Sequence, residues 1–181
     1  MQVHFHRTDG SGGYAVLMRR DDGLTVRLPG LDQTWRVPHD LVHFVAEREF
    51  RLGHGVFGSI AAGAMFANMA VVSGRPRYDA KVRSRAVIKA YAAELSLAEV
   101  LSGVVHDGVE HEVKAAIVYR QVLEAWGSLR SAPCPYQAAT LRRCLVLLDA
   151  LDDKWRAVAV GDRLALRWEL PGGPAWQVAA R

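Results

Sequence analysis

The N-terminal pattern of apolar and polar residues repeats every two positions, which is typical of β-strands. Val3 and Phe5 alternate with polar neighbours, and two more strand-like stretches, 14–20 and 24–28, lie on either side of a turn at 21–23. Successive side chains of a strand point to opposite faces of a sheet, so each stretch has an apolar face to bury. The first 28 residues therefore predict a small antiparallel meander.

From residue 38 the spacing of apolar positions becomes helical. Pro38 suits the first turn of a helix, because its fixed φ is helical and its missing N–H needs no partner there. We expect this helix to run to about Arg51, where the sequence breaks at 52–55. The small and apolar residues of 56–72 then predict a buried second helix that packs back against the first.

Glycine and proline divide the next part of the chain into further helical stretches. Ser96 and Glu99 match a capping box, in which a hydroxyl and a carboxylate accept the free N–H groups of a helix start. Asp107-Gly108 is interpreted as a break. The helices are expected from about Asp79, from Ser96 to about His106, from Val109 to Leu129, and from Tyr136 to Leu151.

Beyond Trp155 the period returns to two. Gly161-Asp162 is a typical two-residue hairpin turn, and the alternating apolar positions after it are Leu164, Leu166, Trp168 and Leu170. This C-terminal hairpin would join the N-terminal meander in a sheet of about four or five strands. The predicted fold is α+β, a bundle of about five helices packed beside a small antiparallel sheet formed by the N-terminal strands and the C-terminal hairpin.

Length and composition favour a single domain over residues 1–181, because half of the residues are apolar and can form one substantial core. The formal charge is +4, but the cations are spread along the chain and most are Arg. The basic run 75–89 is poor in aromatic residues, so a solvated helix face is preferred to a nucleic-acid site. The apolar run 56–72 is interrupted and shorter than the roughly 20 residues of a membrane span. We expect neither nucleic acid nor a membrane as a partner.

The two cysteines carry no recognisable chemistry. Cys134 and Cys144 match neither a zinc-knuckle spacing nor a disulfide framework, and nothing near them indicates an activated thiolate. The first residues lack the basic and apolar regions of a signal peptide, so we expect a reducing cytoplasmic location.

The strongest chemical pattern lies in the helix that begins after Pro38. At about 100 degrees per residue, His39, Asp40, His43 and Glu47 fall within an arc of about 100 degrees. Imidazoles four residues apart come within about 5 to 6 Å of each other, so His39 and His43 can bind one ion. Neutral imidazole and carboxylate groups suit a borderline divalent ion, and zinc is the preferred one. The positive potential at a helix start keeps His39 neutral, as a ligand must be.

One helix cannot surround a cation, so another segment must supply ligands. His39 and Glu47 are separated by about 12 Å of helical rise, which leaves His39 and His43 as the preferred pair with Asp40 or Glu47 as the carboxylate. The richest further supply is 106–112, with two imidazoles and three carboxylates. Its alternative interpretation is an acidic helix start without a ligand role. His54, between two glycines, is a second candidate or a simple exposed loop residue.

A resemblance supports the idea of a helical metal site. The block from Leu28-Pro29 through Phe66, above all 37–47 followed by 55–58, resembles uncharacterised proteins of high-GC bacteria. Within it, 39–43 is similar to the His-Asp-x-x-His core of the zinc-binding ubiquinone-biosynthesis family. A glutamate after eleven intervening residues completes that family's ligand set, and here that position is Gly55. The resemblance implies a His-Asp-His metal site, without quinone chemistry.

The leading hypothesis is a metal-binding protein, extended to a metal-dependent hydrolase of an unknown small-molecule substrate. In this hypothesis Glu47, one turn beyond His43, acts as general base on metal-bound water. The alternative is a non-enzymatic interaction or assembly module, such as a homo-oligomer, whose helix face contacts another subunit. A third interpretation is that His43 and Glu47 belong to a solvated face.

Overall fold

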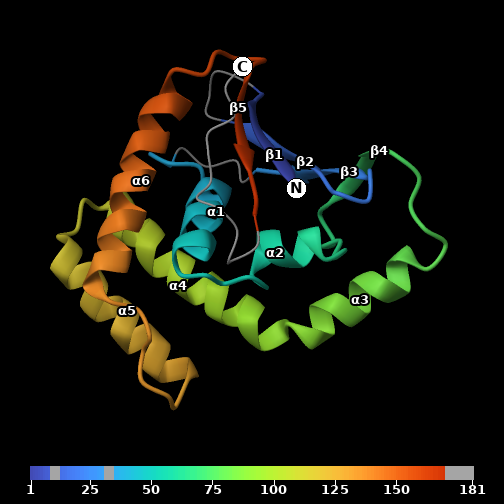
Figure 1. Ribbon diagram of the computed structural model, residues 1–181. Helices are drawn as coiled ribbons and strands as arrows, with labels where there is room; N and C mark the ends of the chain where they lie inside the picture. Colours follow the sequence, from blue (N-terminus) through green and yellow to red (C-terminus); the bar gives the residue numbers. More distant parts are fainter. Residues whose placement is uncertain (9–12, 31–34, 170–181) are drawn as a thin grey trace.

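The computed structural model describes residues 1–8, 13–30 and 35–169. It confirms the α+β fold class, with a five-stranded antiparallel sheet and six helices in the described part of the chain (Figure 1). The strands are β1 (Gln2–Arg7), β2 (Tyr14–Arg19), β3 (Thr25–Pro29), β4 (Ala70–Ser73) and β5 (Arg163–Arg167). The helices are α1 (His39–Glu49), α2 (Val56–Ala61), α3 (Ala80–Ala90), α4 (Ala92–Glu110), α5 (Ala115–Leu129) and α6 (Ala138–Arg156).

The sheet has the strand order β4-β3-β2-β1-β5, and every neighbouring pair is antiparallel. The predicted meander is confirmed, because β1, β2 and β3 pair in sequence with Phe5 opposite Val16 and Val16 opposite Leu28. These alternate residues are buried, as the period of two predicts.

Among the described residues, the C-terminal segment forms one strand, β5, and the first strand of the expected hairpin is not present. α6 continues through Trp155, whose ring is buried, so helical burial outweighs the expected first strand. A turn then brings the chain to β1, where the Gly161 N–H donates to the carbonyl of Arg7 at 2.8 Å and Leu164 lies opposite Phe5. Leu170, the last expected apolar position of this strand, lies outside the described residues.

The helix expected over 56–72 is wrong. α2 ends at Ala61 because Gly63 has a φ of 114 degrees, and the Ala64 N–H turns back to the Ser59 carbonyl at 2.8 Å. This is the left-handed ending that glycine allows and that closes a helix. The chain then forms β4, an exposed edge strand.

The helix boundaries expected at Ser96 and at Asp107-Gly108 are also wrong, because α4 runs through both. The Ser96 hydroxyl donates to the Ala92 carbonyl at 3.0 Å, a bond made inside a helix and not at its start. Gly108 has a packing role. A Cβ there would lie 2.7 Å from Val118 Cγ2, so glycine allows α5 to approach α4 closely.

α1 is the central helix of the molecule. Its residues Leu41–Glu47 are all buried, and it packs against α4 and α6 while Phe44 contacts Phe5 of the sheet (Figure 1). A solvated polar face is therefore wrong for His43 and Glu47, which are 3% and 0% exposed. No helix in the described part of the chain is long and apolar enough to cross a membrane.

Candidate functional site

A pocket of about 340 Å³ lies beside α1, where the end of β3 and the first half of α4 come together. Its apolar lining is Leu28, Pro29, Val56, Phe66 and Leu95, and its polar lining is His39, Asp40, His43, Asn68 and Glu99. Three of the predicted metal ligands, His39, Asp40 and His43, therefore share one pocket. The fourth, Glu47, does not line it.

Three imidazoles meet at the contact between α1 and α4. The ring centroid of His39 is 4.5 Å from that of His43 and 5.3 Å from that of His106. His106 belongs to the remote segment that the sequence indicates as a ligand supply. It makes a hydrogen bond to the backbone of Val37, while its Nε2 is buried and has no hydrogen-bond partner within the described residues. Burial lowers the pKa of His106, which favours its neutral form.

His43 lies between two carboxylates but is hydrogen-bonded to neither. Its Nδ1 is 3.8 Å from Glu47 Oε1, its Nε2 is 3.7 Å from Glu99 Oε2, and both nitrogens are buried without a hydrogen-bond partner in the described chain. Burial disfavours the charged ring, but the two carboxylates outweigh it and raise the pKa of His43. Such an unsatisfied buried group is rare in folded proteins and is a candidate for a functional role.

The pKa of His39 is shifted in the opposite direction to that of His43. Burial, with the nearby rings of His43 and His106, lowers the pKa of His39 to about 4. Its imidazole is therefore neutral at physiological pH, which is the form that binds metals. The sequence-based expectation of a neutral His39 agrees with this direction, although the larger cause is burial and not the helix dipole.

The carboxylate of Glu47 is hydrogen-bonded to the backbone of α2. Its Oε1 accepts the Val56 N–H at 2.7 Å and its Oε2 accepts the Phe57 N–H at 3.0 Å, so it satisfies the free donors at the start of α2. A Cβ on Gly55 would lie only 2.4 Å from Glu47 Cδ.

Asp40 is hydrogen-bonded to Tyr14 of β2 and also lines the pocket. Its Oδ2 accepts the Tyr14 hydroxyl at 2.8 Å, and the same hydroxyl oxygen accepts the Asp40 N–H at 3.2 Å. Burial raises the pKa of Asp40, and the Tyr14 hydrogen bond only partly opposes that rise.

Glu99 is the pocket residue that sequence reasoning missed, because it was assigned to a capping box. With α4 continuous from Ala92, Glu99 and His106 are seven residues apart and occupy one side of the helix, facing α1. Ser102, between them on that side, is fully buried, and its hydroxyl has no hydrogen-bond partner in the described residues. The spacing of Glu99, Ser102 and His106 was the signal that could have revealed this face.

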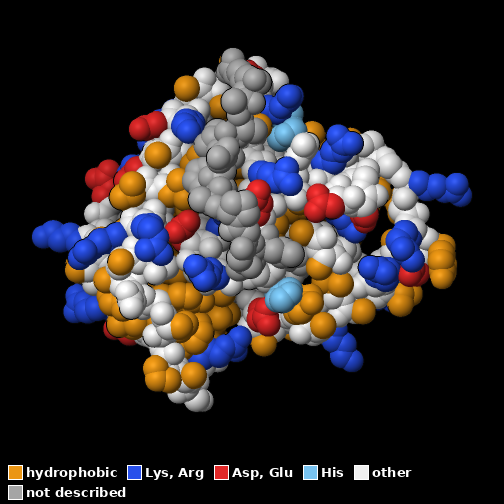
Figure 2. All heavy atoms as spheres, in the orientation of Figure 1, with side chains coloured by type: hydrophobic (Ala, Val, Ile, Leu, Met, Phe, Trp, Pro, Cys, Tyr) orange, Lys and Arg blue, Asp and Glu red, His pale blue; other side chains and the backbone are white. Residues whose placement is uncertain are grey.

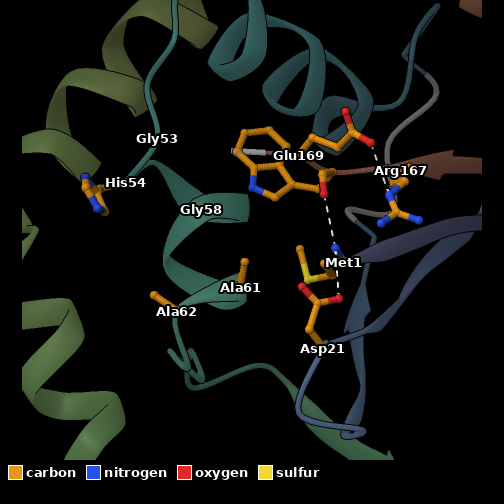
Figure 3. Close-up of a pocket in the computed structure, with 10 residues that line it drawn as sticks. Met1, Asp21, Gly53, His54, Gly58, Ala61, Ala62, Arg167 and Glu169 are labelled. Carbon is orange, nitrogen blue, oxygen red and sulfur yellow. Dashed lines mark hydrogen bonds and ion pairs between the residues drawn. The ribbon is translucent and has the colours of Figure 1, made fainter. Parts of the chain in front are cut away.

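The remaining candidates lie elsewhere. His54 Nδ1 is 2.7 Å from Glu94 Oε2, and its ring stacks on Tyr91 at 3.8 Å. His54 lines a different pocket of about 520 Å³, with Arg167 and Glu169 on the other side (Figure 3). Cys144 is buried in α6, and burial raises the pKa of its thiol.

The pocket is not a preformed metal cage. Within residues 1–8, 13–30 and 35–169, no three His, Cys, Asp or Glu side chains stand close enough together to hold an ion as they are. The 3.7 Å between His43 Nε2 and Glu99 Oε2 is near the separation of about 3.3 Å that two ligands of one tetrahedral zinc ion have at bond lengths of about 2 Å.

Comparison with known proteins adds no relative. No protein-family model matches the chain, and no curated protein or solved structure matches it. The resemblances described for 28–66 stay predictions, and the functional argument depends on the geometry of this pocket.

Proposed function

We propose that the protein binds a divalent metal ion, preferably zinc, with His39, His43 and Glu99 as its ligands. The observation that carries this proposal is His43, a buried imidazole that lacks a hydrogen bond, faces Glu99 at 3.7 Å and packs against His39. Two imidazoles and a carboxylate with an open fourth position are a ligand set of catalytic zinc sites.

The charges around the pocket support a cation. Asp40 and Glu99 bring two carboxylates to its lining, while His39 is neutral. Binding a divalent ion would displace the proton that these carboxylates favour on His43, so metal binding should release a proton near neutral pH.

Glu47 acts on the site through His43. A carboxylate behind a ligating imidazole fixes which nitrogen faces the metal and increases the basicity of the ring. Glu47 lies on the Nδ1 side of His43, opposite Glu99, and its own position is held by the backbone of α2. We therefore replace the general-base role expected for Glu47 with a positioning role.

Hydrolysis of a small molecule is the reaction class that follows from this arrangement. A metal ion lowers the pKa of bound water, and a nearby carboxylate can accept its proton. Burial raises the pKa of both Asp40 and Glu47, but only Asp40 lines the pocket, so Asp40 is the better placed general base. The mainly apolar walls leave room for a small substrate beside the polar floor.

Zinc titration by calorimetry, with metal analysis of the purified protein, tests the proposal. The wild type should bind one ion, and His43→Ala and Glu99→Gln should each abolish binding. His54→Ala is the matched control, because His54 pairs with Glu94 outside this pocket. Binding that is absent in the wild type, or unchanged in His43→Ala, would refute the assignment.

The assembly alternative has less to support it. It requires that His39, His43 and Glu47 contact another subunit, but His43 and Glu47 are buried within one chain. Of the three, only His39 is partly exposed.

A further inference from the structure

Although cations occur along the whole chain, a dense group of them lies in one segment, residues 70–90, which we name the basic arm. It contains a single acidic residue, Asp79, and six cations, Arg75, Arg77, Lys81, Arg83, Arg85 and Lys89. Its net charge of +5 exceeds the +4 of the whole chain, so the rest of the protein is slightly acidic. All six cations are exposed.

The same arm has four exposed large apolar side chains, more than any other segment of that length among the described residues. Tyr78 is 99% exposed, Val82 70%, Val72 54% and Val71 42%. Most large apolar side chains of this protein are buried in the core. Four exposed ones within twelve positions therefore form an unusual surface.

The arm begins with β4, which pairs with β3, but beyond β4 it is attached to the body at few points. In α3 the only buried residue is Ser84, whose hydroxyl accepts the Met65 N–H at 2.8 Å and donates to the Met65 carbonyl at 3.2 Å. On a helix, Val82 lies nearly opposite Ser84, with Arg83 and Arg85 on its two sides. Figure 1 shows the loop after β4 and α3 at one side of the molecule, and Figure 2 shows basic side chains gathered there.

We infer that the basic arm attaches the protein to an anionic lipid surface. Cations beside outward apolar and aromatic side chains are the composition of interfacial helices, in which the cations contact headgroups and the apolar groups enter the acyl boundary. Tyr78 suits the headgroup level, because its ring is apolar and its hydroxyl polar. This mode needs no membrane-spanning helix, but it departs from the sequence-based expectation that a membrane is not a partner.

Two other partners, a nucleic acid and a second copy of the chain, fit the arm less well. A nucleic acid would use the cations, but three exposed valines would have no role and a single tyrosine makes no stacking platform. A second copy of the chain would bring two arms of the same sign together if the arms faced each other. The combination of charge and aliphatic exposure is therefore best explained by lipid.

Vesicle co-sedimentation tests this inference directly. The wild type should bind vesicles of phosphatidylcholine mixed with phosphatidylglycerol, should ignore pure phosphatidylcholine, and should dissociate as salt is raised. Replacing Lys81, Arg83 and Arg85 by Gln should weaken binding on the order of a hundredfold, since each cation near such a surface contributes about 1 kcal/mol. The matched control replaces three exposed cations of α5 and α6, Arg120, Arg142 and Lys154, by Gln and should bind as the wild type does.

A second variant separates lipid from other anions. Tyr78→Ser with Val82→Ser leaves the charge unchanged and should weaken vesicle binding, while binding to a duplex oligonucleotide should not change. Equal binding of both triple variants to vesicles would overturn the inference. So would wild-type binding to the oligonucleotide that is tighter than binding to anionic vesicles.

Discussion

At the scale of single residues, the contact between Glu47 and Gly55 holds the central helix to the next one. The carboxylate of Glu47 accepts two N–H groups of α2, and the lack of a side chain on Gly55 makes room for it. A charged acceptor that is fully buried costs solvation, so its two hydrogen bonds must be kept.

We expect Gly55→Ala to destabilise the protein by about 2 to 4 kcal/mol, because the new Cβ would displace the buried carboxylate from its donors. Urea denaturation measures this change. The control is Gly103→Ala in α4, where a Cβ meets no atom within 4 Å, and helix propensity predicts a gain of up to about 1 kcal/mol. Equal effects of the two variants would show that no clash exists at Gly55.

Glu47→Gln tests the positioning role of Glu47 separately from the ligand role of Glu99. The amide keeps one acceptor and loses the charge, so we expect a loss of about 1 to 3 kcal/mol in stability and of roughly 10- to 100-fold in zinc affinity. Glu99→Gln should leave stability nearly unchanged, since Glu99 is exposed at 57%, and should abolish zinc binding. Calorimetry and urea unfolding on both variants give the comparison. Abolished zinc binding in Glu47→Gln at full stability would make Glu47 a ligand.

The lowered pKa of His39 predicts how stability depends on pH without metal. The unfolded chain takes up a proton at His39 near the ordinary pKa of 6.5, but the folded protein does so only near 4. Proton uptake therefore favours unfolding as the pH falls through that interval, and the contribution of His39 to stability is present above 6.5. His39→Asn should lose less stability than the wild type between pH 7 and pH 5, measured as the shift in urea midpoint. A larger loss in the variant would contradict the lowered pKa.

At the scale of elements, the sequence predicts well what depends on local periodicity. The meander of β1, β2 and β3 is confirmed because alternation and a turn specify it within 28 residues. β4 could not be found this way, since its pairing with β3 is made across forty residues and Gly63 ends α2 early. Long-range pairing and packing thus outweigh the local helical pattern.

The same limit explains why Glu99, one of the three proposed ligands, was missed. His39, His43 and Asp40 are on one helix, so their shared side follows from residue spacing alone. Glu99 was hidden by a capping motif that α4 does not use, and only the packing of α4 on α1 shows that it faces His43. A short motif of common residues, such as this capping box, is a weaker guide to the role of a side chain than the packing of the helix that contains it.

Ser96→Ala distinguishes a continuous α4 from a helix that begins at Ser96. In the structure the hydroxyl bonds only to the carbonyl one turn earlier, so we expect a stability change within about 0.5 kcal/mol. Loss of a true cap costs about 1 kcal/mol or more. Thermal unfolding measures the stability of Ser96→Ala and of a second variant, Ser84→Ala, which removes the hydroxyl that anchors α3 to Met65. The two losses in stability are then compared. A loss at Ser96 larger than that at Ser84 would favour the capping interpretation.

At the scale of the whole molecule, a metal ion at His39, His43 and Glu99 would bind α1 to α4, the two helices that join the sheet side to the rest of the bundle. Zinc should therefore stabilise the entire fold and not one loop, because a ligand that binds only the folded state adds about 2.7 kcal/mol at one hundred times its dissociation constant. We expect the unfolding temperature of the wild type to rise with zinc concentration and that of His43→Ala to stay constant. The unfolding temperature of the variant with Gln at Lys81, Arg83 and Arg85 should rise like that of the wild type, since the lining of the pocket contains none of these three residues. A rise in His43→Ala equal to that of the wild type would place the zinc elsewhere, whereas a rise lost in the arm variant would show that the arm and the pocket act as one site.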